Sequence, residues 1–439
     1  MRFFAVLMGV VLLCACGGRA VPVAPSSLTQ YAQYRDPSEI LFTPAGRIKH
    51  VIVIVQENRT VDNLFNGLPG ADTVTSGLDH TGKQVALKPV PFEELYDPDH
   101  THQAWVTDYD NGKMDGFDLP QTTPKGPADF NYSYVPQNET GPYFQLAERY
   151  TFADRNFSAE SGPSYPGHQY LIAGESQYAI GDPNDPFFRW DCQAAPGTTT
   201  PTLDAQGHVV NGPFPCYDYQ TLGDLLDAKG VNWRYYTELE EKYFGVGVQP
   251  YGAIKHVYKG KDWSKVVAPQ VQIFADLASG TLAPVSWVNA MLLTSDHAQQ
   301  STNYGPDWVA TIVNAVGLSS YWKDTAVFVT WDDWGGWYDH VAPPQLDRMG
   351  LSFRVPLVVV SPFAQHGYVS HVQHEPGSIL HFIEEAFGLG SLGTTDARAD
   401  DLADCFDFSQ TVTPYKVIPT RVGAGFFKSL KPDTKPIDY

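Results

Sequence analysis

A continuous run of β-branched residues, from position 51 to 55, stands out in the pattern of hydrophobic and polar positions. Such a run is typical of a strand that is buried on both faces, as in a parallel sheet covered by helices. The run stops abruptly at the polar segment Glu57-Asn58-Arg59. Ligands of open α/β sheets bind just beyond the carboxyl ends of strands, so this segment is a candidate for binding a cation or a substrate. The alternative is that Thr60 or Asp62 simply begins a helix.

Strand-like and helix-like segments alternate along the rest of the chain. The strand-like segments are residues 231–236, 284–289, 325–330 and 355–360. The helix-like segments are residues 221–229, 306–316 and 376–387. This alternation predicts an α/β fold with a mostly parallel central sheet and helices on both faces. Two stretches rich in Gly, Pro, Asp and Tyr, 67–142 and 181–215, are interpreted as long loop insertions that form walls or lids.

The amino terminus has the pattern of an export signal. Arg2 is followed by an apolar run at residues 3–13, which is too short to span a bilayer, and then by small residues. The segment Leu13-Cys14-Ala15-Cys16 resembles a bacterial lipobox, which predicts cleavage before Cys16 and lipidation of its thiol. We therefore expect a lipoprotein signal peptide at 1–15, a tether at 16–46 and a single domain at 47–439. The protein would be exported and lipid-anchored in the cell envelope, periplasmic or at the outer membrane, or secreted after cleavage at another small residue.

Charge and cysteine content narrow the range of partners. The formal net charge is −20, and loss of Arg2 with the signal would make it more negative. Such an acidic protein binds nucleic acid poorly, so we expect no nucleic-acid partner. In an exported protein, Cys192 and Cys216 could form a disulfide and leave Cys405 unpaired, although other pairings remain open. The sequence contains no CxxC pair, so it gives no indication of a thiolate metal site.

Two adjacent carboxylates follow the strand predicted at 325–330. Like charges repel each other, so Asp332 and Asp333 indicate that a cation or a proton lies between them. Their hard oxygen donors suit a divalent metal ion. Gly335 and Gly336 would allow a tight turn close to whatever is bound. The alternative is a solvated acidic turn.

Ser164 and several histidines are the other candidates for chemistry. Ser164 lies among turn residues, shortly before an apolar segment, and could present its hydroxyl as a nucleophile. The flanking sequence is not GxSxG, so there is no case for the nucleophile elbow of an esterase. The histidines of interest are His100, His102, His297, His340, His371 and His374. Of these, His297 follows Asp296 soon after a predicted strand, where an imidazole could act near a bound phosphate.

Taken in order, these segments resemble the bacterial phospholipase C and acid phosphatase family, which belongs to the alkaline-phosphatase-like superfamily. The resemblance is carried by VIVIVQENRTVDNLFNGLPGAD, DHTH with GKMDGF, SGPSYPGHQYLIAG, VSWVNA with DHAQQS, VFVTWDDWGGWYDHVAPP, and RVPLVVVSPFAQHGYVSH with SILHFIEEAFGL. It covers about residues 47–390, and the ordered set is far more specific than any one motif. The segment GPSYPG departs from the GPTxPNR that is commoner in phospholipases.

The resemblance implies a role for each cluster. The metal ligands that it implies are Glu57, Asn58, Ser164, Asp332 and Asp333. Ser164 would be the nucleophile, and His100 and His297 would contact phosphate, one of them protonating the leaving group. His102, Asp339 and His340 could also line the site. The implied protein is a phosphoesterase that uses a divalent metal ion and forms a phosphoseryl intermediate.

Two questions about function stay open at this level. The substrate could be a phosphomonoester, as in acid phosphatases, or a phospholipid, as in phospholipase C. Aromatic residues make up 13% of the chain, enough for a cation–π cage around choline, but most of them are expected to pack in the core or in loops. The alternative from another class is a non-catalytic surface lipoprotein that binds phosphate or lipid. That alternative predicts a broken site, whereas all five implied ligands are present.

Overall fold

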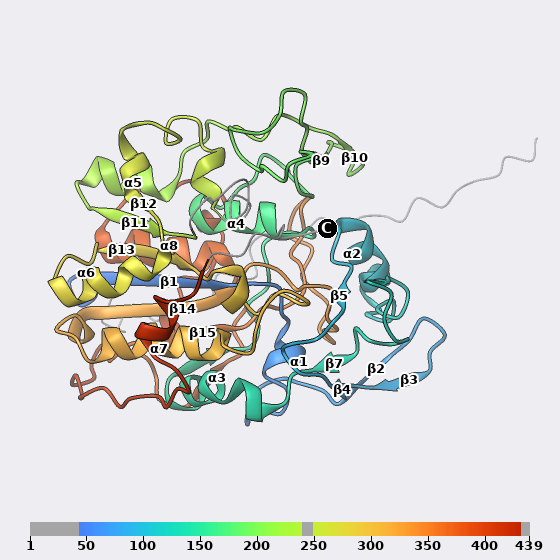
Figure 1. The fold of residues 1–439 in the computed structure, drawn as a ribbon, viewed down its shortest axis with the longest axis horizontal. Helices are drawn as coiled ribbons and strands as arrows, with labels where there is room; N and C mark the ends of the chain where they lie inside the picture. Colours follow the sequence, from blue (N-terminus) through green and yellow to red (C-terminus); the bar gives the residue numbers. More distant parts are fainter. Residues whose placement is uncertain (1–43, 239–248, 432–439) are drawn as a thin grey trace, which may run out of the picture. The chain divides into compact units, whose positions relative to one another are not determined.

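An eight-stranded sheet forms the core of the fold in the computed structural model, which describes residues 44–238 and 249–431 (Figure 1). From one edge to the other, its strands are β12 (Val266–Val267), β11 (Trp233–Tyr236), β13 (Val285–Asn289), β1 (His50–Gln56), β14 (Thr325–Trp331), β15 (Leu357–Val360), β8 (Thr151–Ala153) and β16 (Tyr368–Ser370). Every residue of β1 after His50 is buried, as the hydrophobic run predicts.

Most neighbouring strands in the sheet run parallel. β1 pairs in parallel with β13 on one side and with β14 on the other, so Val53 lies opposite both Trp287 and Phe328. β15 is the exception, because it runs antiparallel to β14 and to β8. The segment between β14 and β15 contains no helix, and a parallel return needs a crossover connection. The prediction of a mostly parallel α/β sheet is confirmed, with an antiparallel strand that the sequence pattern did not indicate.

Helices pack on both faces of the sheet. The described helices are α1 (Val61–Leu64), α2 (His102–Tyr109), α3 (Gln137–Arg149), α4 (Ser164–Ala173), α5 (Leu222–Lys229), α6 (Ile273–Ser279), α7 (Gly305–Gly317), α8 (Pro376–Phe387) and α9 (Ala424–Phe427). On one face, Trp287 donates to Leu171 of α4, and the Phe328 ring contacts Phe382 of α8. On the opposite face, Gln56 donates to Tyr143 of α3 at 3.0 Å.

The three helices predicted from sequence are found as α5, α7 and α8. Thr221 and Asp224 form a capping box at the start of α5, and Pro376 occupies the first turn of α8, where its missing N–H costs no hydrogen bond. Both signals are local, which explains why the bounds of α5 and α8 follow from sequence to within one residue.

The stretch 67–142 is more ordered than the loop interpretation allowed. It contains α2, the start of α3 and the short strands β2 (Ser76–Leu78), β3 (Gln84–Ala86), β4 (Lys88–Pro89), β5 (Asp97–Pro98), β6 (Thr122–Thr123) and β7 (Ser133–Tyr134). Pro142 lies inside α3, where the carbonyl that it leaves unbonded belongs to the exposed residue Asn138. Aromatic residues of this stretch, such as Trp105 and Tyr132, pack into a small hydrophobic core of their own with Tyr338. Aromatic packing, rather than periodicity, therefore orders the insertion.

The second insertion, 181–215, contains a hairpin and leads into a disulfide. The hairpin is formed by β9 (Pro201–Leu203) and β10 (Val209–Asn211). Cys192 and Cys216 are joined by a disulfide, and Cys405 is a buried free thiol. The first of the pairings considered from sequence is thus the one present.

The predicted signal peptide, Cys16 and most of the tether lie outside the described residues. The described residues all belong to one compact unit of the chain. Among the helices of residues 44–238 and 249–431, none has both the length and the apolar character that crossing a membrane requires.

Candidate active site

The polar residues that follow β1 and β14 meet at the carboxyl edge of the sheet. Gln56 and Trp331 end their strands in register with each other, so the residues after them are brought side by side. The backbone N–H of Asn58 donates to Asp332 Oδ1 at 3.0 Å. The capping alternative also holds, since Thr60 caps α1 through the N–H of Asn63. Residues 57 and 58 thus lie in the site while residue 60 starts a helix.

Ser164 is the first residue of α4 and points into this cluster. Its Oγ lies 3.1 Å from Asp333 Oδ2 and 3.3 Å from Asn58 Oδ1. The close approach of α4 depends on Gly167, because a Cβ there would lie 3.0 Å from the carbonyl oxygen of Asp332. The N-terminus of a helix favours a bound anion such as phosphate. The structure therefore brings together all five residues that the resemblance implied as metal ligands.

The turn after Asp333 fixes the backbone around Asn58. Asn58 has a φ of 57°, a left-handed conformation that non-glycine residues seldom adopt. Gly335 also has a left-handed φ of 62°, and a Cβ on it would lie 2.2 Å from the carbonyl oxygen of Asn58. Asp333 Oδ1 accepts from the N–H of Gly335 at 2.7 Å. Gly335 thus allows this turn to approach the backbone of Asn58 closely.

Two histidines hold the side-chain amide of Asn58. His100 Nδ1 lies 2.8 Å from the carbonyl oxygen of Pro98, and His297 Nδ1 lies 2.8 Å from that of Ala298. A carbonyl oxygen only accepts, so each Nδ1 carries the proton, and Nε2 of a neutral ring keeps its lone pair. Asn58 Nδ2 lies 3.0 Å from His100 Nε2 and 3.3 Å from His297 Nε2. Its two protons therefore point at two ring nitrogens that accept in the neutral form of each histidine.

This orientation turns Asn58 Oδ1 toward other oxygens. It lies 3.1 Å from Glu57 Oε2 and 3.1 Å from Asp332 Oδ1. The reversed amide would donate to both carboxylates, but it would require a proton on Nε2 of both His100 and His297. With neutral histidines, a cation between the oxygens is what makes the orientation favourable. The donor set, mostly carboxylate and amide oxygens, fits a divalent metal ion.

His168 belongs to this cluster and was missed by the sequence analysis. It lies one turn after Ser164 on α4, and its Nε2 is 3.2 Å from Glu57 Oε1 and 3.5 Å from Asp332 Oδ2. Atoms of Glu57, His168 and Asp332 are close enough together to bind one metal ion. Reading GPSYPG as a turn concealed the helical spacing of Ser164 and His168. In the GPTxPNR motif this position is held by Arg.

Glu160 is a second residue that sequence reasoning missed. Its side chain is fully buried, and burial raises the pKa of its carboxyl well above the usual range, with the carboxylates of Asp333 and Asp182 raising it further. The charged form of Glu160 is therefore disfavoured close to the acidic cluster. No feature of the sequence around Ser164 distinguishes this glutamate from an exposed one.

A cavity of about 560 Å³ adjoins the site. His102, Pro163, Phe188 and Trp190 are among the residues that line it, and Pro163 directly precedes Ser164. His102 Nδ1 lies 2.8 Å from the carbonyl oxygen of Ser161, and burial lowers the pKa of His102. His102 is one of the three residues, with Asp339 and His340, that could also have lined the site. It borders the cavity beside Ser164.

Asp339 and His340 instead belong to a separate network in which Asp339 is buried and His340 is partly exposed. Asp339 accepts from Arg354 at 2.6 Å, and His340 Nδ1 lies 2.7 Å from Asp62 Oδ2. The suggestion that they line the site is not supported by these contacts. Asp296 likewise does not share the contacts of its neighbour His297. It accepts from Tyr143 at 2.7 Å and from Trp331 at 3.1 Å, beneath the site.

Comparison with known proteins relates the chain to phosphoesterases and to phospholipases C. The family model described as Phosphoesterase family matches residues 48–390. The non-hemolytic phospholipase C of Pseudomonas aeruginosa is 24% identical over 427 residues, which cover 82% of this chain and 57% of that protein. Phospholipase C B of Mycobacterium tuberculosis is 24% identical, with coverage of 84% and 79%. The non-specific phospholipase C1 of Arabidopsis thaliana is 23% identical, with coverage of 89% and 74%.

The chain spans little more than half the length of the Pseudomonas relative, 57%. Among solved structures, a protein in the alkaline phosphatase superfamily from Vibrio parahaemolyticus has a TM-score of 0.39 and 12% sequence identity, over 80% of this chain and 70% of that one.

Proposed function

Because the chain belongs to the Phosphoesterase family, we propose that it hydrolyses phosphate esters with Ser164 as the nucleophile and a divalent metal ion as cofactor. The observation that carries the proposal is the position of the Ser164 hydroxyl. It lies at the N-terminus of α4, within 3.1 Å of Asp333 and 3.3 Å of Asn58. The named relatives, which are phospholipases C, support the same class of reaction.

The proposed metal ligands surround one point at the end of the sheet. They are Glu57, Asn58, Ser164, Asp332 and Asp333, with His168 as an additional candidate from the structure. When bound, the ion would lower the pKa of the serine hydroxyl and neutralise charge on the phosphate. His100 and His297 keep the amide oxygen of Asn58 turned toward this point.

The chain's own residues account for the steps of the reaction. Ser164 Oγ, whose hydroxyl donates to Asp333, attacks phosphorus in line with the leaving group. The proton of the Ser164 hydroxyl passes to Asp333 as the bond between phosphorus and the ester oxygen breaks. The departing alkoxide takes a proton from Nε2 of His100 or His297, which must first bind a proton from solvent and then no longer accepts from Asn58. Asp333 later releases its proton to solvent. Water then attacks the phosphoserine, releasing phosphate or a phosphate monoester and returning the proton to Ser164.

The substrate is a phosphomonoester or a phospholipid. The names of the relatives favour a phospholipid, and the cavity beside Pro163 provides room for a group attached to the phosphate. The departure from GPTxPNR around Ser164 argues against carrying the substrate over from phospholipases directly. Assays of the metal-loaded protein on p-nitrophenyl phosphate and on p-nitrophenylphosphorylcholine separate the two. Turnover of neither would favour the non-catalytic alternative, a binding protein with the same fold.

The export signal adds a proposal about location. The lipobox at residues 13–16 would place a lipid on Cys16, so the enzyme would act in the cell envelope, tethered to a membrane. An enzyme held at a membrane surface would meet phospholipid substrates without needing a membrane-spanning helix.

A further inference from the structure

A second group of potential metal ligands lies away from the candidate active site, next to the edge strand β16. It consists of His374, which follows β16, and of Asp404 and Cys405, which belong to a short 3₁₀ helix, η8 (Ala403–Cys405). These residues have no part in the proposed reaction. His374 and Cys405 were noted separately from the sequence, but nothing connected them with each other or with Asp404, because they form no CxxC pair and His374 lies about 30 positions before the other two.

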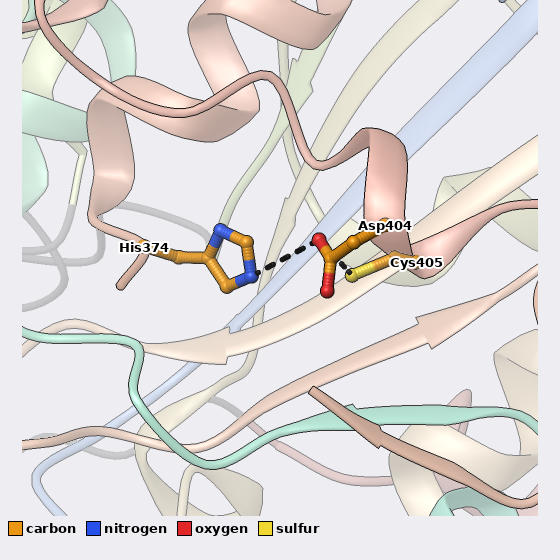
Figure 2. Close-up of side chains that lie close together, drawn as sticks. All are labelled: His374, Asp404 and Cys405. Atoms are coloured by element: carbon orange, nitrogen blue, oxygen red, sulfur yellow. Dashed lines mark hydrogen bonds and ion pairs between the residues drawn. The ribbon is translucent and has the colours of Figure 1, made fainter. Parts of the chain in front are cut away.

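We propose that His374, Asp404 and Cys405 bind a zinc ion, with water as the fourth ligand. His374 Nε2 lies 3.5 Å from Asp404 Oδ1, and Cys405 Sγ lies 3.7 Å from the same oxygen (Figure 2). All three ligand atoms are within 4.8 Å of one another. Tetrahedral zinc with ordinary bonds to nitrogen, oxygen and sulfur separates its ligand atoms by roughly 3.3–3.6 Å. Small movements of the side chains would therefore complete the site.

Neighbouring side chains orient these ligands. His374 Nδ1 lies 3.2 Å from Asp400 Oδ1, and a metal-bound histidine commonly directs its other ring nitrogen to a carboxylate. Asp404 Oδ2 accepts from Ser370 Oγ at 2.5 Å, which leaves Asp404 Oδ1 facing the imidazole and the thiol. Ligating carboxylates are usually hydrogen-bonded in the same way.

The exposure of the ligand side chains and the chemistry of their donor atoms determine which ion can bind. The side chains of His374 and Cys405 are fully buried, whereas those of Asp404 and Asp400 are 24% and 32% exposed and provide a path for entry. A set of imidazole, carboxylate and thiolate donors suits zinc and excludes the harder magnesium and calcium ions.

Hydrogen bonding without a metal is the competing arrangement. Ser370 Oγ lies 3.2 Å from His374 Nε2, so serine alone could bridge the histidine and Asp404. In this arrangement the thiol of Cys405 donates to Asp404 Oδ1 at 3.7 Å, so all three side chains are joined by hydrogen bonds alone. In the metal-bound arrangement, the thiol loses its proton and the ion joins the segment after β16 to η8.

Cobalt(II) is the probe that separates the two arrangements, because thiolate bound to cobalt absorbs strongly in the near ultraviolet. The candidate active site has no thiolate among its ligands, so this absorbance reports Cys405. We expect Co²⁺ in excess over both proposed metal sites to produce the band in the purified protein and Zn²⁺ to remove it. Cys405→Ser should abolish the band, whereas Asp333→Asn should keep it. This contrast also distinguishes failure of the present proposal from failure of the proposed function.

Matched variants distinguish a loss of metal binding from a loss of folding. Asp404→Asn changes a partly exposed ligand and should weaken Co²⁺ binding at least tenfold. Asp407→Asn removes an equal charge two residues beyond Cys405, from an exposed carboxylate that bonds to Ser409, and should leave binding unchanged. No band in the wild-type protein with excess Co²⁺, or a band that persists in Cys405→Ser, would overturn the proposal.

Discussion

Ser164 Oγ donates to Asp333 Oδ2 at 3.1 Å, although the two residues are 169 positions apart in the chain. One begins a helix on a face of the sheet, and the other follows a central strand. Their meeting places a hydroxyl group beside a carboxylate at the point where parallel strands end. The chemistry proposed for the site depends on this contact.

Replacement of Ser164 by Ala should reduce turnover by at least about a thousandfold, since the attacking oxygen is lost. Metal binding should largely remain, because Glu57, Asp332 and Asp333 are unchanged. Rapid quenching of the wild-type protein with substrate labelled in the phosphoryl group should trap label on Ser164. Ser264→Ala is a suitable control, because this exposed serine donates to the carbonyl of Lys261 and has no part in the proposed site. Near-normal activity of Ser164→Ala would mean that water attacks phosphorus directly.

Replacement of Asp333 by Asn should weaken metal binding, because a neutral amide takes the place of an anionic donor. The variant should resemble wild-type protein treated with a chelator. Wild type should regain activity when metal is restored, and Asp333→Asn should require a much higher metal concentration. Isothermal titration of the metal into both proteins measures the difference. Equal affinities would remove Asp333 from the ligand set.

Replacement of His168 by Gln should lower metal affinity about 10- to 100-fold, the usual effect of losing a ligand or a group that orients one. The reason is the contact of Nε2 with both Glu57 and Asp332. His168→Arg restores the residue of the GPTxPNR motif and would bind the same carboxylates through its guanidinium. Metal titration and the ratio of kcat to KM should therefore recover more in the Arg variant than in the Gln variant. A purely structural histidine would lower thermal stability without changing metal affinity.

Replacement of Asp296 by Asn should change how stability depends on pH. Burial raises the pKa of Asp296 from 3.8 to about 6, despite hydrogen bonds from Tyr143 and Trp331 that favour its charged form. The unfolded chain loses this proton near pH 4 and the folded protein near pH 6, so this group's contribution to stability falls across that interval and is constant above it. The asparagine side chain cannot ionise.

The stability of Asp296→Asn relative to wild type should therefore rise by about 2 kcal/mol between pH 4 and pH 6. Urea unfolding of both proteins, each measured at several pH values, gives this difference directly. A difference that does not change with pH would show that Asp296 ionises at its ordinary pKa in the folded protein.

Replacement of Cys16 by Ala should move the protein from the membrane fraction to the soluble fraction of the cell envelope or the medium. The physical reason is loss of the thiol that would carry the lipid. Cys14→Ala is the control, since it leaves Cys16 in place. An unchanged distribution of Cys16→Ala would indicate ordinary secretion or another anchor.

Much of the framework follows from the sequence alone. The uninterrupted β-branched run of β1 and the caps of α5 and α8 are local signals, and local signals fix local structure. Acidic and amide residues directly after buried strands predicted a site at the carboxyl edge, because parallel strands end together there. The family and the α/β fold are confirmed, whereas the roles of the individual site residues stay predictions.

Other features were decided only by tertiary structure. The direction of β15, the orientation of the Asn58 amide and the entry of His168 into the site each depend on elements distant in sequence. The same holds for Cys405, which meets His374 only because η8 packs beside the end of β16. Hydrophobic periodicity records which side of an element is buried, but it does not record which other element covers it. Packing of the whole chain sets the contacts between elements that are distant in sequence. Both proposed metal sites are formed by such contacts.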